Sequence, residues 1–559
     1  MKKLMYCILE VIGYHEVRDM LEVFMKLKNL RNQLSSQKIK GYLIPSKDEF
    51  LGEYTPKHLA RLKWLTDLEC SNGLAIITDK KALFLTDGRY FTAARAELSK
   101  DWEIGDISDG AYIKNWVKKN IGDLPVGFDP MVFNDKDYNC FKKLDLNLKI
   151  LESNLVDLVW SRKDEVKTEV YFLEKAQAGQ NIQNKITSVC ESLSDDVDYV
   201  LFTNPEATGW LLNMRGNDLE FTPLVLSYLF LSKDGNFKLF LKNELSDAKQ
   251  YFLDLIKRKK KIQFDENKTP YWFFAHGGKA INLKADPTEL MKSIKNETEL
   301  KGIRKAHEED GKAVQKFLKW FKGNVGKVDE IEAAEKLLEF RKASKNFISN
   351  SFETISAYGS NGAIIHYKPT KKTSKLIKKD SLYLLDCGAQ YQFGTTDITR
   401  TMCFGKPTKE QKTNYTLVLK GHIALAMAEF PEGTNGSQLD ILARQFLWSY
   451  GLDYGHGTGH GVGHFLSVHE GPQRIGKMGA NQPLLEGMII SNEPGFYKVG
   501  EYGIRIENLV EVVKSSKKGF LKFSTITQVP IDTNLVDKKL LTPAELKWLT
   551  EYNKRCKIK

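Results

Sequence analysis

Histidines concentrate in one stretch of this chain. Four of the ten histidines in 559 residues stand at positions 456, 460, 464 and 469, in a segment rich in glycine. His456 and His460 are four residues apart, which on a helix would place both imidazoles on one face, as in HExxH zinc sites. The glycines between them disfavour a helix and instead allow backbone to approach a ligand closely. We therefore expect a loop in which the two histidines need not share one role.

Four carboxylates adjoin short apolar runs on either side of this loop. Asp386 ends one run and Asp397 enters the next, so a hairpin would place both carboxylates on one face. Glu493 and Glu507 each follow a further apolar run. Acidic groups beside strand interiors are costly unless they are paired or bound to a cation. Four carboxylates with one histidine form an oxygen-rich ligand set, which favours manganese or a similar divalent ion.

Each of these residues also has a structural explanation. An aspartate at a strand end is most often a cap or turn residue, and a histidine beside glycines is often only a loop residue. Glu507 could simply pair with Arg505. All of these explanations would have to hold at once within one domain, so we favour a metal site.

Helices and strands must position these residues. A helical pattern near residues 297–322 predicts the helix that opens the third domain. A helical pattern between residues 157 and 192 is expected to open the second domain. Thr542 as the N-cap and Pro543 at the first helical position predict a helix that closes the chain.

The amino-terminal half shows one strand pattern twice. A short apolar run is followed by a Trp-Leu pair and then by two runs that form a hairpin, and the same order returns later in the chain. Runs of this length bounded by turn residues are typical of strands. The expected strands are 41–44, 74–78 and 82–86 in the first copy and 199–202, 227–231 and 238–241 in the second. A repeat at roughly 150 residues indicates duplicated α/β domains.

Size and composition restrict the class of protein. A chain of 559 residues is too long for one hydrophobic core and predicts two to four domains. No run of 18 or more apolar residues occurs, so we expect no membrane partner. Seven scattered cysteines without a CxxC pair predict reduced thiols and a cytoplasmic location. The net charge of +12 raises nucleic acid as a partner, but the basic runs lack interleaved aromatics, so none is expected.

The first 24 residues need a separate interpretation. They begin with two lysines and an apolar stretch, but Glu10 interrupts that stretch and no small-residue cleavage site follows. Met25 stands directly before a helical segment. We expect residues 1–24 to be an extension without function.

Longer strings of residues resemble a known family. The ordered set Asp386, Asp397, His460, Glu493 and Glu507 is similar to the metal-binding signature of the pita-bread metallopeptidases, which include methionine aminopeptidase, prolidase and aminopeptidase P. From about Met25 onward the chain further resembles the three-domain cytosolic Xaa-Pro aminopeptidases. The segments that carry this resemblance are 86–90, 210–216, 361–367, 456–463, 468–472 and 491–495.

The resemblance implies a fold of mixed α/β and α+β class. Two creatinase-like amino-terminal α/β domains would be followed by a pita-bread catalytic domain that ends in a helix. The implied parts are the extension 1–24, domain I at 25–155, domain II at 156–292 and the catalytic domain at 293–559. A homodimer is implied as well.

The resemblance also implies a role for each site residue. Asp386 and Asp397 would bind or bridge two divalent ions, most favourably Mn²⁺, while Glu507 would bridge them and His460 and Glu493 would complete their coordination. The implied substrate-binding residues are His366, His456, His469, Arg505 and Arg89. His464 matches no functional position of the family and is interpreted as structural.

The implied reaction is hydrolysis of the amino-terminal Xaa-Pro bond in peptides with proline second. Two ions about 3.5–4 Å apart can bridge one water and lower its pKa toward about 7, and the resulting hydroxide attacks the carbonyl. Glu493 would shuttle protons, and His469 or His366 would donate hydrogen bonds to the oxyanion. Prolidase, with the same ligands but normally two domains, is the alternative. A non-catalytic pita-bread binding module is a further alternative, although such relatives typically lose metal ligands.

Overall fold

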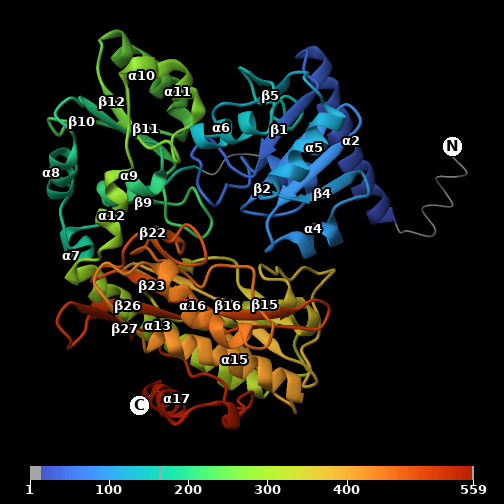
Figure 1. Cartoon of the computed structure of the whole chain (residues 1–559), viewed down its shortest axis with the longest axis vertical. Coiled ribbons are helices and arrows are strands. Elements are labelled where there is room, and N and C mark those ends of the chain that lie inside the picture. Colours follow the sequence, from blue (N-terminus) through green and yellow to red (C-terminus); the bar gives the residue numbers. More distant parts are fainter. Residues whose placement is uncertain (1–13, 163–166, 557–559) are drawn as a thin grey trace, which may run out of the picture. The chain divides into compact units, whose positions relative to one another are not determined.

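In a computed structural model of the chain, the structure describes residues 14–162 and 167–556 (Figure 1). These residues divide into two compact units. The first unit comprises the chain up to Glu169 together with residues 190–208 and 225–286, and the second comprises residues 170–189, 209–224 and 287–559. The second unit therefore includes two segments that lie, in sequence, within the expected domain II. The expected domain boundaries stay predictions.

Two sheets of the first unit share one strand order. In each sheet a central strand pairs antiparallel with a hairpin on one side and parallel with the next strand on the other. The first sheet, in the order β4-β3-β2-β1-β5-β6, comprises β1 (Gly41–Pro45), β2 (Gly73–Thr78), β3 (Ala82–Thr86), β4 (Trp102–Asp106), β5 (Val126–Phe128) and β6 (Leu148–Ile150). The second, in the order β11-β10-β8-β12-β13, comprises β8 (Tyr199–Phe202), β10 (Ser227–Ser232), β11 (Phe237–Leu241), β12 (Ile262–Phe264) and β13 (Ile281–Leu283). The predicted duplication is confirmed.

Helices accompany both sheets, and their apolar faces complete the cores. The helices of the first unit include α2 (Tyr14–Ser36), α3 (Arg61–Thr66), α4 (Phe91–Glu97), α5 (Gly110–Asn120), α6 (Asp135–Lys143), α10 (Leu245–Lys257) and α11 (Tyr271–Gly277). The predicted extension 1–24 falls partly outside the described residues. Its described part belongs to α2, which begins at Tyr14 and continues past Met25.

The helix predicted between residues 157 and 192 is wrong in its first half. Strand β7 (Val170–Phe172) pairs antiparallel with β9 (Met214–Gly216), and only then follow the helices α7 (Lys175–Ala178) and α8 (Ile182–Ser192). The residues of β7 are valine, tyrosine and phenylalanine, which favour strands. Gly179 separates α7 from α8 with a φ of +74°, where glycine is favoured because it lacks a Cβ.

Two antiparallel sheets of the second unit carry the expected site residues. One has the order β15-β16-β19 and the other the order β20-β27-β26-β23-β21-β22. Their strands are β15 (Ile355–Tyr358), β16 (Tyr383–Cys387), β19 (Ile398–Met402), β20 (Glu429–Pro431), β21 (Gly459–Gly461), β22 (Glu470–Ile475), β23 (Ile489–Asn492), β26 (Asn508–Lys514) and β27 (Phe520–Thr525). A small sheet of β14 (Phe347–Asn350), β17 (Ala389–Tyr391) and β18 (Gly394–Thr395) and a hairpin of β24 (Gly495–Lys498) and β25 (Tyr502–Arg505) complete this part.

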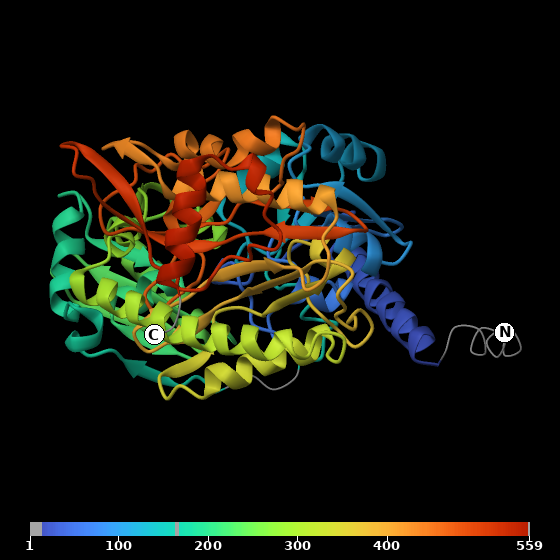
Figure 2. The same ribbon diagram turned by 90° about the horizontal axis from the view of Figure 1, so that it is seen from below.

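Helices lie on both sides of these strands. In Figure 2 the yellow-green helix α13 runs along one side, and the orange helices α15 and α16 lie on the other. The helices of this part are α12 (Pro287–Ser293), α13 (Glu297–Lys322), α14 (Glu330–Lys342), α15 (Lys409–Ala426), α16 (Gly436–Trp448) and α17 (Pro543–Arg555). The predicted helices at 297–322 and at the end of the chain are confirmed. Thr542 caps α17 through its side chain, which accepts a hydrogen bond from the backbone N–H of Glu545.

No helix within residues 14–162 and 167–556 is long and apolar enough to cross a membrane.

Candidate metal centre

The pairing of β16 with β19 places two aspartates on one face of their sheet. The strands are antiparallel, with Asp386 opposite Thr399 and Cys387 opposite Ile398. Asp397 directly precedes Ile398, so it lies two positions from Asp386 along the pair. Side chains two positions apart share a face of a sheet. The predicted juxtaposition of the two carboxylates is confirmed, although the chain between them forms the additional strands β17 and β18.

The other three expected ligands come from the larger sheet and its connections. His460 lies in β21, Glu493 directly follows β23, and Glu507 stands between β25 and β26. The glycine-rich segment around His460 is not helical, as predicted, but residues 459–461 form a strand rather than part of a loop. Ser491 orients two of these residues, because its Oγ accepts from the backbone N–H of His460 at 2.9 Å and donates to Glu493 Oε1 at 3.2 Å. Thr399 donates from Oγ1 to Glu507 Oε2 at 2.8 Å.

Ligand atoms from these strands form overlapping groups. Asp386, Asp397 and Glu507 form one group, and His460, Glu493 and Glu507 form a second, with the ligand atoms in each group within 4.8 Å of one another. Asp397, His460 and His469 form a third group. Glu507 belongs to the first two groups and Asp397 to the first and third. Such sharing is the arrangement that two neighbouring ions with bridging carboxylates require.

The chemistry of the donor set fits divalent cations. Asp386 Oδ1 and Asp397 Oδ1 are buried and have no hydrogen-bond partner among the described residues. Burial raises the pKa of Glu507 well above its ordinary value, and the charges of Asp397, Glu493 and Asp386 raise it further. Burial also raises the pKa values of Asp386 and Glu493. Buried carboxylates that repel one another in this way are stabilised by a bound cation.

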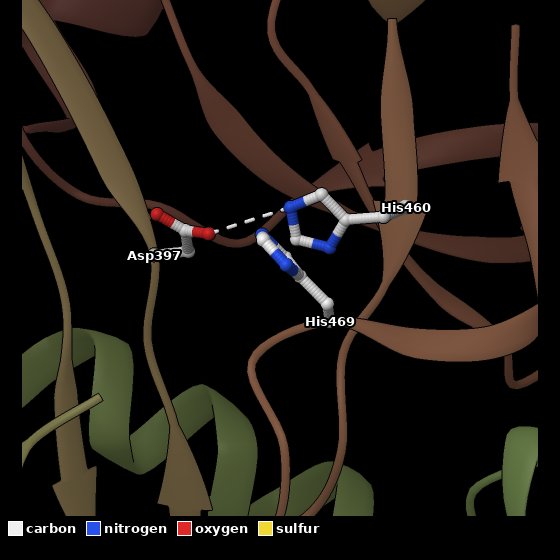
Figure 3. A group of neighbouring side chains, drawn as sticks. All are labelled: Asp397, His460 and His469. Carbon is white, nitrogen blue, oxygen red and sulfur yellow. Dashed lines mark ion pairs between the residues drawn. The ribbon is translucent and has the colours of Figure 1, made fainter. Parts of the chain in front are cut away.

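His460 and His469 lie beside Asp397 (Figure 3). His460 Nε2 is 3.5 Å from Asp397 Oδ2 and 3.5 Å from Glu493 Oε1. Burial opposes protonation of His460, but Asp397 and Glu493 raise its pKa to about 9. The imidazole of His469 meets that of His460 edge to face, with ring centroids 4.3 Å apart. The structure therefore brings His469 to the same group of ligand atoms as Asp397 and His460.

A chain of hydrogen bonds runs from Asp386 to His456. Arg505 Nη2 donates to Asp386 Oδ2 at 2.5 Å, and its Nη1 donates to the hydroxyl of Tyr497 at 2.6 Å. That hydroxyl lies 2.8 Å from His456 Nε2, and His456 Nδ1 lies 2.7 Å from the carbonyl of Gly457. Because a carbonyl only accepts, the proton of His456 stands on Nδ1, and Tyr497 donates to Nε2. Burial keeps His456 neutral by lowering its pKa to about 3.

Arg505 contacts Asp386, so the structural alternative in which Arg505 pairs with Glu507 is wrong. His366 lies nearby, because the carbonyl of its neighbour Ile365 accepts from Arg505 Nη2 at 3.5 Å. Arg89 belongs to the first unit, where it forms an ion pair with Asp87 at 2.8 Å. The substrate-binding roles of these residues stay predictions.

Three polar residues of the site lay outside the sequence-based prediction. Ser491 and Thr399 orient ligands, and Tyr497 joins Arg505 to His456. Ser491 directly precedes Asn492-Glu493 in a segment that carries the family resemblance, so its position offered a signal. Tyr497 would have been found by predicting the β24–β25 hairpin, whose register sets Tyr497 opposite Gly503, two residues before Arg505.

Comparison with protein families matches almost the whole chain. Residues 26–157 and 161–299 each match a creatinase/prolidase N-terminal domain. Residues 301–514 match metallopeptidase family M24, and residues 519–559 match the C-terminal region of that peptidase family.

Individual proteins are similar over comparable lengths. The chain is 38% identical to a protein of Neurospora crassa named probable Xaa-Pro aminopeptidase P, over 94% of this chain and 85% of that protein. It is 39% identical to a protein of the same name from Sordaria macrospora, over 94% of each. Among solved structures, the X-prolyl aminopeptidase of Caenorhabditis elegans, described as a cytosolic enzyme with a di-nuclear active site, superimposes with a TM-score of 0.91 at 34% identity, covering 96% of this chain and 95% of that one. Two creatinase-type amino-terminal domains, the catalytic domain and these relatives together show that the chain belongs to metallopeptidase family M24.

Proposed function

We propose that this chain is a metal-dependent aminopeptidase that releases the first residue from peptides with proline in the second position. The observation that carries the proposal is the cluster of Asp386, Asp397, His460, Glu493 and Glu507, whose ligand atoms form overlapping groups that could each hold a metal ion. It occurs in a chain that resembles, over nearly its full length, an X-prolyl aminopeptidase with a di-nuclear active site. Two divalent ions, which we propose to be Mn²⁺, would supply Lewis acidity and lower the pKa of water at this cluster.

Glu493 is the residue of this chain that moves protons in the proposed reaction. One of its carboxylate oxygens faces His460 at 3.5 Å, and the other lies 4.0 Å from His456 Nδ1. Because its carboxylate lies among the ligand atoms, Glu493 can take up the proton of the attacking water. The same proton is then available for the proline nitrogen, which leaves as a secondary amine.

Histidines complete the proposed site. His469, which lies beside His460, and His366 are proposed to donate hydrogen bonds to the oxygen that gains negative charge at the scissile carbonyl. His366, His456 and Arg505 are proposed to line a pocket for the pyrrolidine ring, and Arg89 is proposed to bind substrate from the first unit. We also propose a homodimer and a cytoplasmic location, the latter in keeping with the description of the C. elegans enzyme as cytosolic.

Strict preference for proline is the expected result of a substrate comparison. Proline lacks an amide hydrogen and makes the preceding bond a tertiary amide, so a dedicated site recognises the ring by shape. A single missing methylene in a pocket costs about 10–200-fold, and alanine lacks two ring carbons. We expect kcat/KM for Arg-Pro-Pro to exceed that for Arg-Ala-Ala by more than about 100-fold with manganese.

The dipeptide Arg-Pro is the control for the prolidase alternative. An aminopeptidase of the proposed type cleaves the tripeptide in preference, whereas a prolidase cleaves the dipeptide. Comparable values for Arg-Pro-Pro and Arg-Ala-Ala would leave a metal aminopeptidase without proline specificity.

Replacing Tyr497 by phenylalanine is expected to lower kcat by about 10-fold or more while metal content stays unchanged. The variant leaves buried Arg505 without one acceptor and His456 Nε2 without its donor. A hydrogen bond to a charged group contributes about 1.5–3 kcal/mol, which sets this scale. Tyr502→Phe is the matched control, because its hydroxyl accepts from Asn414 instead. Equal effects of the two substitutions on kcat would remove Tyr497 from the site.

A further inference from the structure

The segment between His460 and His469 contains one residue in an unfavourable backbone conformation, which contacts with other segments must stabilise. Phe465 adopts a φ of +50°, in the left-handed region that a bulky side chain rarely occupies. Its side chain is fully buried beside Leu173 and Ala178. A residue keeps such a conformation only where the surrounding structure fixes it. Polar contacts with three other segments of the second unit do so here.

Arg215 holds the middle of this segment. Its guanidinium donates from Nε to the carbonyl of Phe465 at 2.5 Å and from Nη2 to the carbonyl of His464 at 3.0 Å. Its Nη1 donates to Gly209 and Met214, within its own segment. Arg215 is 3% exposed, and all four of these hydrogen bonds go to backbone carbonyls. The planar fork of arginine can hold two adjacent carbonyls at once, which the single ammonium of lysine cannot reproduce.

An ion triad holds the end of the segment, immediately after His469. Glu470 Oε1 lies 2.5 Å from Lys295 Nζ, and its Oε2 lies 3.2 Å from Lys292 Nζ. The three side chains are each 1% exposed. Lys295 Nζ also donates to the backbone carbonyl of Lys292 at 2.7 Å, which links the two lysines of the triad. Both carboxylate oxygens of Glu470, the residue after His469, are therefore held by ion pairs.

A further hydrogen bond holds the segment between the residues held by Arg215 and the residue held by the ion triad. Gln390 Nε2 donates to the carbonyl of Leu466 at 2.8 Å. Contacts therefore reach residues 464, 465, 466 and 470 from three elements, so that the segment is fixed on both sides of Val468.

Buried charges are weak evidence for stability, because well-packed apolar residues of similar volume often serve stability equally well. What charged and bidentate contacts supply is a defined geometry. A donor to an oxyanion must stand within about 0.5 Å of its productive place, and it depends on neighbouring residues to hold it there. His469 stands one residue before Glu470 and four residues after Phe465, both of which are held by these contacts.

We propose that Arg215 and the Lys292–Glu470–Lys295 triad are positioning residues that fix the segment 462–470 and so place the imidazole of His469 at the catalytic centre. The inference rests on the proposed function for the role of His469. Arg215, Lys292 and Lys295 all lie within residues 161–299, which match the second creatinase/prolidase N-terminal domain. That part of the chain thereby contributes directly to the geometry of the peptidase site.

The test compares Arg215→Lys with Arg304→Lys in the manganese-loaded full chain. Arg304 forms a bidentate ion pair with Glu511 in the same unit. Its replacement by lysine is the same chemical change, and among the hydrogen bonds of the described residues none joins Arg304 to residues 462–470. We expect Arg215→Lys to lower kcat by about 10-fold or more, since a misplacement of about 1 Å can cost about 100-fold. KM and metal content should stay within about two-fold of the unmodified chain. Arg304→Lys should change neither.

A double substitution separates positioning from general damage. If Arg215 acts through His469, Arg215→Lys should lower kcat by less than about two-fold in a His469→Ala background, because the group that it positions is gone. Hydrogen exchange gives a second readout that needs no activity. Amides within residues 462–470 should exchange at least about 10-fold faster in Arg215→Lys, with peptides outside this segment and outside residues 209–216, which Arg215 also contacts, unchanged.

The proposal is overturned if Arg215→Lys lowers kcat by the same factor with and without His469, or if exchange within residues 462–470 does not change. Should Arg215→Lys fail to fold, the same three measurements are made on Glu470→Asp. This substitution keeps the negative charge but shortens the reach of the carboxylate to both lysines. If the unmodified chain cleaves no Xaa-Pro peptide, the proposed function fails, and hydrogen exchange still decides whether Arg215 fixes the segment.

Discussion

Replacing Asp397 by asparagine is expected to release at least one of two metal ions and to lower kcat by more than about 100-fold. The amide keeps the shape of the side chain but removes the charge that offsets a cation. Asp397 belongs to two of the three ligand groups, and its Oδ1 has no other partner among the described residues. Loss of an outer partner of a metal ligand typically costs about 10–100-fold, so the loss of a ligand should exceed that range.

The measurements are metal content per chain by elemental analysis and kcat with Arg-Pro-Pro. Asp532→Asn is the matched control, because its carboxylate accepts backbone hydrogen bonds from Cys403 and Asn534 and lies outside the ligand groups. Chelation of the unmodified chain should abolish activity, and manganese should restore it best. Two ions retained by Asp397→Asn would refute the assignment of Asp397 as a ligand.

Much of the fold followed from local pattern in the sequence. The hairpins β2–β3 and β10–β11 were predicted because apolar runs end at turn residues, and α17 because Thr542 and Pro543 mark a helix start. The helix expected from residue 157 onward was wrong at residues 170–172, because these form a strand that gains its partner from residues 214–216, more than 40 positions away. Pairings of this range leave no local periodicity, so the apolar residues alone suggested a helix.

The residues of the candidate site were likewise predicted only in part. The five expected ligands come together because each lies in or adjoins a strand, and four of them are visible in the sequence as carboxylates beside apolar runs. Residues that support the site were missed, because Tyr497 and Arg215 have ordinary types at ordinary spacings. Arg215 acts on backbone carbonyls some 250 positions away. A contact to a backbone carbonyl depends on tertiary structure and on no particular residue type in the partner. The only sequence signal for Arg215 was its place in segment 210–216, which carries the family resemblance.

Replacing His469 by alanine is expected to lower kcat by about 100-fold or more and to leave both metal ions in place. Removal of one donor to an oxyanion has this scale, because the donor acts in a water-poor site where charge develops. His464→Ala is the matched control from the same segment. His464 is 3% exposed, its Nδ1 lies 4.0 Å from Glu299, and burial lowers its pKa to about 3, so that it stays a neutral core residue.

His464→Ala and His469→Ala should therefore lower different quantities, the melting temperature in the first and kcat in the second. His464→Ala removes a buried ring and should lower the melting temperature through the cavity that it leaves, while kcat measured well below that temperature stays within a few-fold of the unmodified chain. His469 is only partly buried, so His469→Ala should show the reverse, with a nearly unchanged melting temperature and a large loss of kcat. Because the imidazoles of His469 and His460 are in contact, metal content must be measured alongside kcat. A loss of metal in His469→Ala would make His469 a ligand rather than an oxyanion donor, and equal effects of both variants on kcat would end the distinction between them.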